Sequence, residues 1–196
     1  MIALRGRSLF AMGLVTGAGA VSALACALAV PAIVLGTTAA ALPSVSTQAR
    51  FATPATYLAN PNGTPAITYE RATVPVGSWI RVTQSVNKWG GMNVRLRVKG
   101  LRANEKYNAE VHVGKCTDDP ANAGAHFQNG RSKDSYEANE FWLNFRTDRA
   151  GKASVLTQQY WGIAQNQKAD SVMIHKHGSR EPAACVTVPF KRIWPW

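Results

Sequence analysis

The sequence predicts an all-β protein, an antiparallel β-sandwich or barrel of about eight strands. Short runs of residues alternate between apolar and polar side chains with a period of two. Turn-forming clusters such as NKWGGMN and TDRAG separate these runs. No convincing helical pattern competes with them. These observations together favour sheets whose strands each bury one face.

The run MNVRLRVKGL, residues 92–101, shows the pattern most clearly. Apolar residues at positions 94, 96 and 98 alternate with basic residues at 95, 97 and 99, which is typical of a half-buried antiparallel strand. Seven further strands are predicted in the ranges 66–72, 78–86, 107–116, 141–148, 151–161, 170–177 and 184–190. The polar loop from about 117 to 139 is too long for a plain hairpin, and long loops in compact domains are often functional.

The first part of the chain differs in composition from the rest. Arg5 and Arg7 precede a long apolar run, and no charged residue occurs from Ser8 until Arg50. This pattern predicts that residues 1–41 are a signal peptide, with a later cut after Ala49 or an uncleaved membrane anchor as alternatives. Residues 42–64 have no sustained period and are interpreted as a linker or ordered arm. Residues 65–196 have the size of one domain.

The charge of the exported part is strongly positive. Without Arg5 and Arg7 the chain keeps 20 basic against 11 acidic residues. Such a field attracts small anions and favours association with an anionic cell envelope. The basic residues are dispersed along an exported chain, so a nucleic-acid partner is not expected. The oligomeric state is not indicated.

Two cysteines, Cys116 and Cys185, follow the export segment. A pair of cysteines in an exported chain predicts a disulfide, with free thiols as the alternative.

All four histidines lie between these cysteines: His112, His126, His175 and His177. His112 shares a strand face with Glu110, and His175 shares one with His177, because side chains alternate along a strand. Each histidine taken singly is typical of a solvated polar face. A disulfide would draw the segments together, however, and imidazoles converging from several segments suit copper or zinc.

The motifs GLRANEKYNAEVHVGKC, AGAHFQN, NEFWLNFRTDRAGKASV, SVMIHKH and ACVTVPF occur in this order between Val94 and Phe190. Through them the chain resembles the copper-zinc superoxide dismutase family, particularly secreted actinobacterial members. The resemblance implies a Greek-key β-sandwich in which a disulfide between Cys116 and Cys185 ties the active-site loop to the last strand.

The resemblance also implies a copper site. Family members bind copper through four histidines, and three of these positions correspond to His112, His126 and His175. The loop histidine, His126, would take and release the catalytic proton. The fourth position falls on Glu110, and His177 is an alternative ligand or a neighbour of the ligands.

Other family features are absent. Residues 127–147 contain no histidine, and their only carboxylates are Asp134, Glu137 and Glu140. Zinc is therefore not expected at the family's second site. The family's anion-guiding arginine, three residues before the last cysteine, is replaced by Pro182. The basic residues that could take its place are Arg180, Lys176 and Arg131.

The predicted function is an exported copper-binding protein that dismutates superoxide to oxygen and hydrogen peroxide at a copper-only site with altered ligands. The alternative is a non-catalytic metal-binding or cell-envelope protein on the same fold, or one that has lost its metal altogether. Three histidines and a glutamate could equally hold zinc in a closed tetrahedral site. The sequence leaves the metal open.

Overall fold

The computed structural model describes residues 44–60, 62–130 and 136–192. The predicted export segment, residues 1–41, lies outside them, and so does Arg131. Within these described ranges no helix is both long and apolar enough to cross a lipid bilayer.

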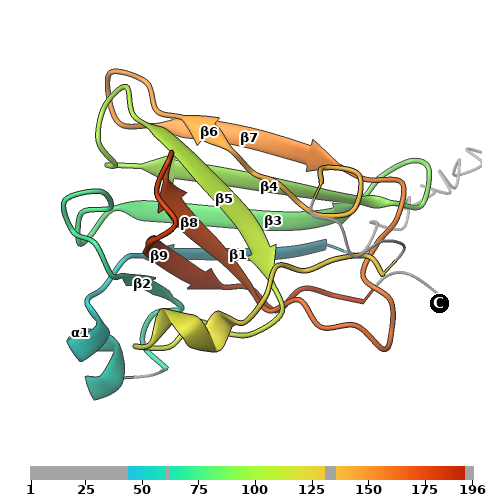
Figure 1. Cartoon of the computed structure of the whole chain (residues 1–196), viewed down its shortest axis with the longest axis horizontal. Coiled ribbons are helices and arrows are strands. Elements are labelled where there is room, and N and C mark those ends of the chain that lie inside the picture. Colours follow the sequence, from blue (N-terminus) through green and yellow to red (C-terminus); the bar gives the residue numbers. More distant parts are fainter. Residues whose placement is uncertain (1–43, 61, 131–135, 193–196) are drawn as a thin grey trace, which may run out of the picture. The chain divides into compact units, whose positions relative to one another are not determined.

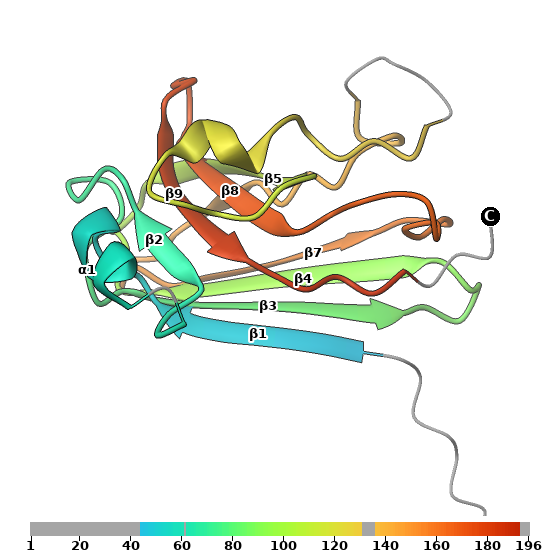
Figure 2. The ribbon, with the colours of Figure 1, turned by 90° about the horizontal axis from the view of Figure 1, so that it is seen from below.

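Two antiparallel sheets face each other (Figures 1 and 2). The first has the strand order β1-β3-β4-β7 and the second has the order β2-β9-β8-β5-β6. The strands of the first sheet are β1 (Ser44–Arg50), β3 (Trp79–Val86), β4 (Met92–Lys99) and β7 (Ala153–Gln158). Those of the second are β2 (Ala66–Thr68), β5 (Lys106–His112), β6 (Phe145–Arg146), β8 (Ser171–Lys176) and β9 (Pro182–Thr187). The predicted β-sandwich is confirmed.

The strand connections form Greek keys. β5 pairs with β6, and β7 contacts β6 where the two sheets meet, so these three consecutive strands are neighbours. β8 then returns to pair with β5 on its other edge, while β7 pairs with β4. Three consecutive strands with a fourth lying beside the first is the Greek-key arrangement.

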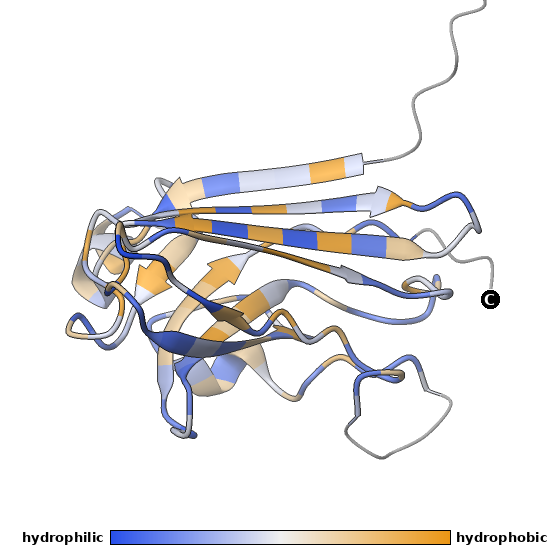
Figure 3. Ribbon diagram, turned by 90° about the horizontal axis from the view of Figure 1, so that it is seen from above, coloured by the Kyte–Doolittle hydropathy of each residue, from blue (hydrophilic) through white to orange (hydrophobic). Residues whose placement is uncertain are grey.

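The core lies between the sheets because one face of each long strand is apolar. Val94, Leu96 and Val98 of β4 are buried against Val111 and Ile174 of the second sheet. Figure 3 shows the alternation of hydrophobic and hydrophilic residues along the strands of the first sheet. The side chains on the outer face of β5 are therefore not part of this core.

Residues 42–64 were interpreted as a linker or ordered arm, and Ser44–Arg50 of this segment forms a strand. β1 pairs with β3 along its whole length, from Ser44 opposite Ser85 to Arg50 opposite Trp79. The ordered arm thus applies to β1, and its strand was not predicted because the inward side chains, Val45, Thr47 and Ala49, give only a weak apolar period.

A short helix, α1 (Pro54–Ala59), follows β1 and was also not predicted. Thr53 caps it by accepting a hydrogen bond from the Thr56 amide, and Pro54 occupies the first turn, where its missing N–H costs nothing. The helix has six residues, none of them buried, so it lacks the apolar period by which a helix is recognised.

The Cys116–Cys185 disulfide is present, as predicted. It joins the segment after β5 to β9, and both cysteines are buried beside Ile67 and Met173. The Cys116 amide also donates a hydrogen bond of 3.1 Å to Thr187 Oγ1. The start of the long loop is therefore fixed to the second sheet by a covalent bond and a hydrogen bond.

Candidate metal centre

The outer face of β5 carries Glu110 and His112, since Ala109 and Val111 of the same strand point into the core. β8 lies alongside and brings His175 opposite Asn108, one diagonal step from Glu110. On the edge of β5 away from β8, isolated bridges join Glu110 to Trp142 and His112 to His126. Glu110 and His112 are consequently only 8% and 7% exposed.

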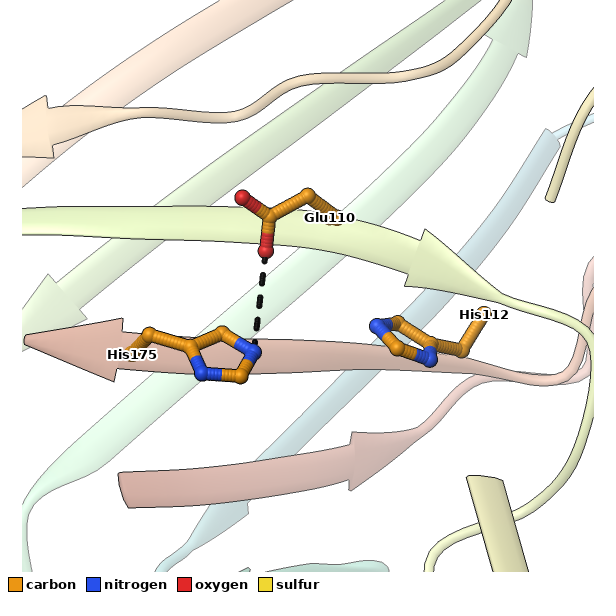
Figure 4. A group of neighbouring side chains, drawn as sticks. All are labelled: Glu110, His112 and His175. Carbon is orange, nitrogen blue, oxygen red and sulfur yellow. Dashed lines mark ion pairs between the residues drawn. The ribbon is translucent and has the colours of Figure 1, made fainter. Parts of the chain in front are cut away.

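Three of these side chains converge (Figure 4). One ligand atom each from Glu110, His112 and His175 lie within 4.8 Å of one another. Glu110 Oε2 is 3.9 Å from His175 Nε2, beyond hydrogen-bond distance. Glu110 Oε2 and His112 Nε2 are both buried and have no hydrogen-bond partner among the described residues. Unpartnered buried polar atoms are costly, and a cation between them would satisfy both.

The hydrogen bonds of the imidazoles fix which nitrogen faces the cluster. His112 Nδ1 is 2.8 Å from the Gly124 carbonyl oxygen, and His175 Nδ1 is 3.2 Å from that of Glu181. A carbonyl can only accept, so each Nδ1 carries the proton and donates it. Nε2 then holds the lone pair. This is the arrangement of metal-binding histidines, whose other nitrogen donates to an oxygen.

His126 lies beside the cluster without completing it. Its ring is 4.9 Å from that of His112, centroid to centroid, in an edge-on arrangement. His126 Nδ1 lies 3.0 Å from Oε2 of Glu140, so its Nε2 is also left with the lone pair. The Nδ1 nitrogen of His126 thus has a carboxylate as its partner. The side chain of His126 is 39% exposed, which gives it access to solvent protons.

Burial shifts the protonation of the cluster. Burial raises the pKa of Glu110 to about 7, and the nearby Glu140 carboxylate adds to this rise while His126 opposes it. Burial lowers the pKa of His112 to about 4, and it lowers the pKa of His175 as well. Both imidazoles are therefore neutral at pH 7, as metal ligands must be.

These shifts predict how metal affinity depends on pH. Because Glu110 is protonated below pH 7 in the metal-free protein, a metal that binds its carboxylate displaces that proton. Affinity is expected to fall about tenfold per pH unit from pH 7 toward pH 5, while His112, with its pKa near 4, contributes little there.

Calorimetric titration with zinc at pH 6, in two buffers of different ionisation enthalpy, counts the protons released. Wild type should release about one proton more than Glu110→Gln. Equal proton release by the two proteins would show that Glu110 does not bind the metal.

The remaining predicted residues lie elsewhere. His177 follows the end of β8, is exposed, and its Nδ1 is 2.9 Å from Asn108 Oδ1. Lys176 forms an ion pair of 3.6 Å with Glu105. Arg180 lies exposed in the turn before β9, and Pro182 is opposite His175. The structure thus brings Glu110, His112 and His175 together. The basic residues Lys176 and Arg180 lie away from them, at the end of β8 and in the turn before β9.

Three groups that orient the imidazoles were not identified from the sequence: the Glu140 carboxylate and the backbone carbonyls of Gly124 and Glu181. Glu140 is buried and also accepts hydrogen bonds from Gln128 and Trp142. The Gly124 carbonyl is a backbone group without a side-chain signal. Glu140 could have been found by asking which carboxylate of the long loop can hold the second nitrogen of His126.

No protein-family model matches the chain, and no curated protein matches it. Solved structures do. A double mutant of a SOD-like protein from Bacillus subtilis has 15% identity and a TM-score of 0.43, covering 55% of this chain and 87% of that one. The Cu/Zn superoxide dismutase from Brucella abortus has 15% identity and a TM-score of 0.43, covering 73% of this chain and 99% of that one. Both likenesses are to superoxide dismutase-like proteins at low identity.

Proposed function

We propose that this protein is an exported copper-binding protein that converts superoxide to oxygen and hydrogen peroxide. His112, His175 and His126 supply nitrogen ligands and Glu110 supplies an oxygen ligand. The single observation that supports this most is the convergence of Glu110, His112 and His175, with two buried atoms that lack hydrogen-bond partners. The resemblance of the sequence motifs to the copper-zinc superoxide dismutase family supports a copper site at these positions.

The donor set fits a borderline divalent metal. Neutral imidazoles suit copper and zinc, while a single carboxylate leaves the site much less negative than sites for calcium or magnesium. When bound, copper supplies one-electron oxidation and reduction, which zinc cannot supply.

The residues around the site have separate tasks in this proposal. Glu140 holds the proton on His126 Nδ1, so Nε2 is the atom that takes up a proton and returns it. The partly exposed His126 ring connects that atom with solvent. Arg180 lies in the turn whose Glu181 carbonyl orients His175, and its charge favours approach of a small anion.

A non-catalytic metal-binding role is the second candidate, and Glu110 is the observation that favours it. A carboxylate is a harder donor than imidazole and stabilises Cu(II) or Zn(II) relative to Cu(I). A site that disfavours Cu(I) binds Cu(II) tightly, and the bound copper is then reduced and reoxidised slowly.

One experiment tests the proposal and separates the two roles. The oxidised full chain is titrated with copper in a competition assay, and superoxide removal is measured at one equivalent. We expect one copper per chain, with His112→Ala losing affinity at least about tenfold. The exposed His177→Ala is the matched control and should bind like wild type. Binding without superoxide removal supports the second role, and failure to bind copper at micromolar concentration contradicts both.

Glu140 provides a test of the role of His126. Glu140→Gln keeps the size of the side chain but removes the charge, so it weakens the hold on the Nδ1 proton. We expect superoxide removal to fall about tenfold while copper stoichiometry is unchanged. Nitrogen NMR of the imidazole reports the tautomer. Full activity with a mixed His126 tautomer would show that this orientation does not matter.

A further inference from the structure

The outer face of the first sheet is entirely free of acidic residues. The side chains that point away from the core come from alternate positions of β1, β3, β4 and β7. None of these positions holds Asp or Glu. Five of them are basic: Arg50, Arg81, Arg95, Arg97 and Lys99. We refer to these five residues as the basic face.

The basic face is an unfavourable arrangement for the isolated protein. Arg81 and Arg97 are directly opposite each other on β3 and β4, and like charges in opposed positions destabilise a sheet. Among the described residues none of the five forms an ion pair with a carboxylate. The side chains of Arg50, Arg97 and Lys99 are exposed. Their charges therefore remain available to an external anion.

The cations form a line along one strand. Arg95, Arg97 and Lys99 are two residues apart on β4, so they are spaced by about 6.7 Å along the strand. Arg81 of β3 lies next to Arg97, the middle residue of this line. At one end an open pocket of about 590 Å³ lies between Arg50 and Lys99. A row of regularly spaced cations complements a chain of regularly spaced anions.

The ring of Trp79 contacts two of these cations, so it is not free to stack against nucleic-acid bases. Lys99 Nζ is 5.0 Å from the centre of its ring, and the Arg81 guanidinium is 5.7 Å from it. Single-stranded nucleic acids are bound through exposed aromatic rings as well as charge, and this ring is occupied. Among the described residues, the exposed large apolar side chains beside the basic face are Leu156 of β7 and Val76, which lines the pocket, whereas membrane surfaces bind apolar side chains in number.

We propose that the basic face binds a linear phosphate polymer that carries no bases, with the chain lying along β4 and ending at the pocket beside Arg50. Binding is electrostatic and needs no metal, so it is independent of the proposed superoxide chemistry.

The test uses long-chain inorganic polyphosphate as the probe and the full chain as the protein. The triple variant Arg95→Gln, Arg97→Gln and Lys99→Gln should bind about a hundredfold more weakly at low salt. Its affinity should also depend less steeply on salt concentration, because fewer counterions are released. The control triple Lys115→Gln, Arg149→Gln and Lys168→Gln has the same net charge, alters exposed positions outside this sheet, and should bind nearly like wild type.

A second variant guards against misfolding. Arg95→Lys with Arg97→Lys keeps the charges and should retain the binding. Equal losses in the two triple variants would overturn the proposal, because binding would then follow net charge alone. It would also be overturned by tighter binding to single-stranded DNA, or to phosphatidylglycerol vesicles, than to polyphosphate at equal phosphate concentration.

Discussion

Glu110→His is expected to raise superoxide removal by the copper-bound protein at least about tenfold. The substitution exchanges the one hard ligand of the cluster for an imidazole and so stabilises Cu(I) relative to Cu(II). Each tenfold change in that preference moves a one-electron potential by about 59 mV, in the direction that speeds the reduction of the metal. It also removes a buried carboxylate whose Oε2 has no hydrogen-bond partner in the described part of the chain. Stopped-flow decay of superoxide at one copper per chain measures the effect.

Glu110→Gln is the matched control for this prediction. It removes the same charge without supplying a nitrogen lone pair, so it should bind copper more weakly than wild type and should not gain activity. If Glu110→His binds one copper and is no faster than wild type, the carboxylate does not limit the reaction. That result would remove the observation on which the non-catalytic role rests.

Removing the disulfide is expected to have the largest effect on stability. Cys116 and Cys185 are 69 residues apart, and closing a loop of this length stabilises a fold by about 4 kcal/mol on the chain-entropy model. The whole free energy of unfolding of a domain is roughly 5–15 kcal/mol. Cys116→Ala with Cys185→Ala should therefore lower the urea midpoint strongly, and the metal affinity with it, because the loop carrying Gly124 and His126 starts at Cys116.

The single variant Cys185→Ala is the control, because it breaks the same bond and leaves one thiol. It should be destabilised about as much as the double variant. A loss of less than about 1 kcal/mol in both would mean that backbone contacts such as the bond from Cys116 to Thr187 hold the loop without the disulfide.

The eight strands predicted from alternation are all present, because a strand that buries one face alternates apolar and polar residues along its sequence. This alternation is a less reliable signal for the strands at the edges of the two sheets. The predicted strand 141–148 is reduced to Phe145–Arg146, since the residues before it form only isolated contacts with β5. β1 was missed because threonine and alanine on its inner face resemble a polar linker.

The candidate site was predictable in part for the same reason. Alternation places Glu110 and His112 on one face, and the structure brings His175 to them. His177 follows the end of β8, and its ring contacts Asn108 and does not join the cluster. The carbonyl partners at Gly124 and Glu181 could not be derived, because a hydrogen bond between a loop and a strand depends on the folded path of the chain.

The acceptors that orient the three imidazoles come from chain segments other than those that carry the rings: His112 from the Gly124 turn, His126 from Glu140, and His175 from the turn at Glu181. An unfolded chain has no such arrangement, so its histidines compete weakly for metal. The proposed metal binding would then be thermodynamically linked to folding, and a free metal concentration one hundred times the dissociation constant would add about 2.7 kcal/mol to the stability of the folded state. Because of the same linkage, the melting temperature should rise with each tenfold increase in the free metal concentration, so it reports how much metal is available.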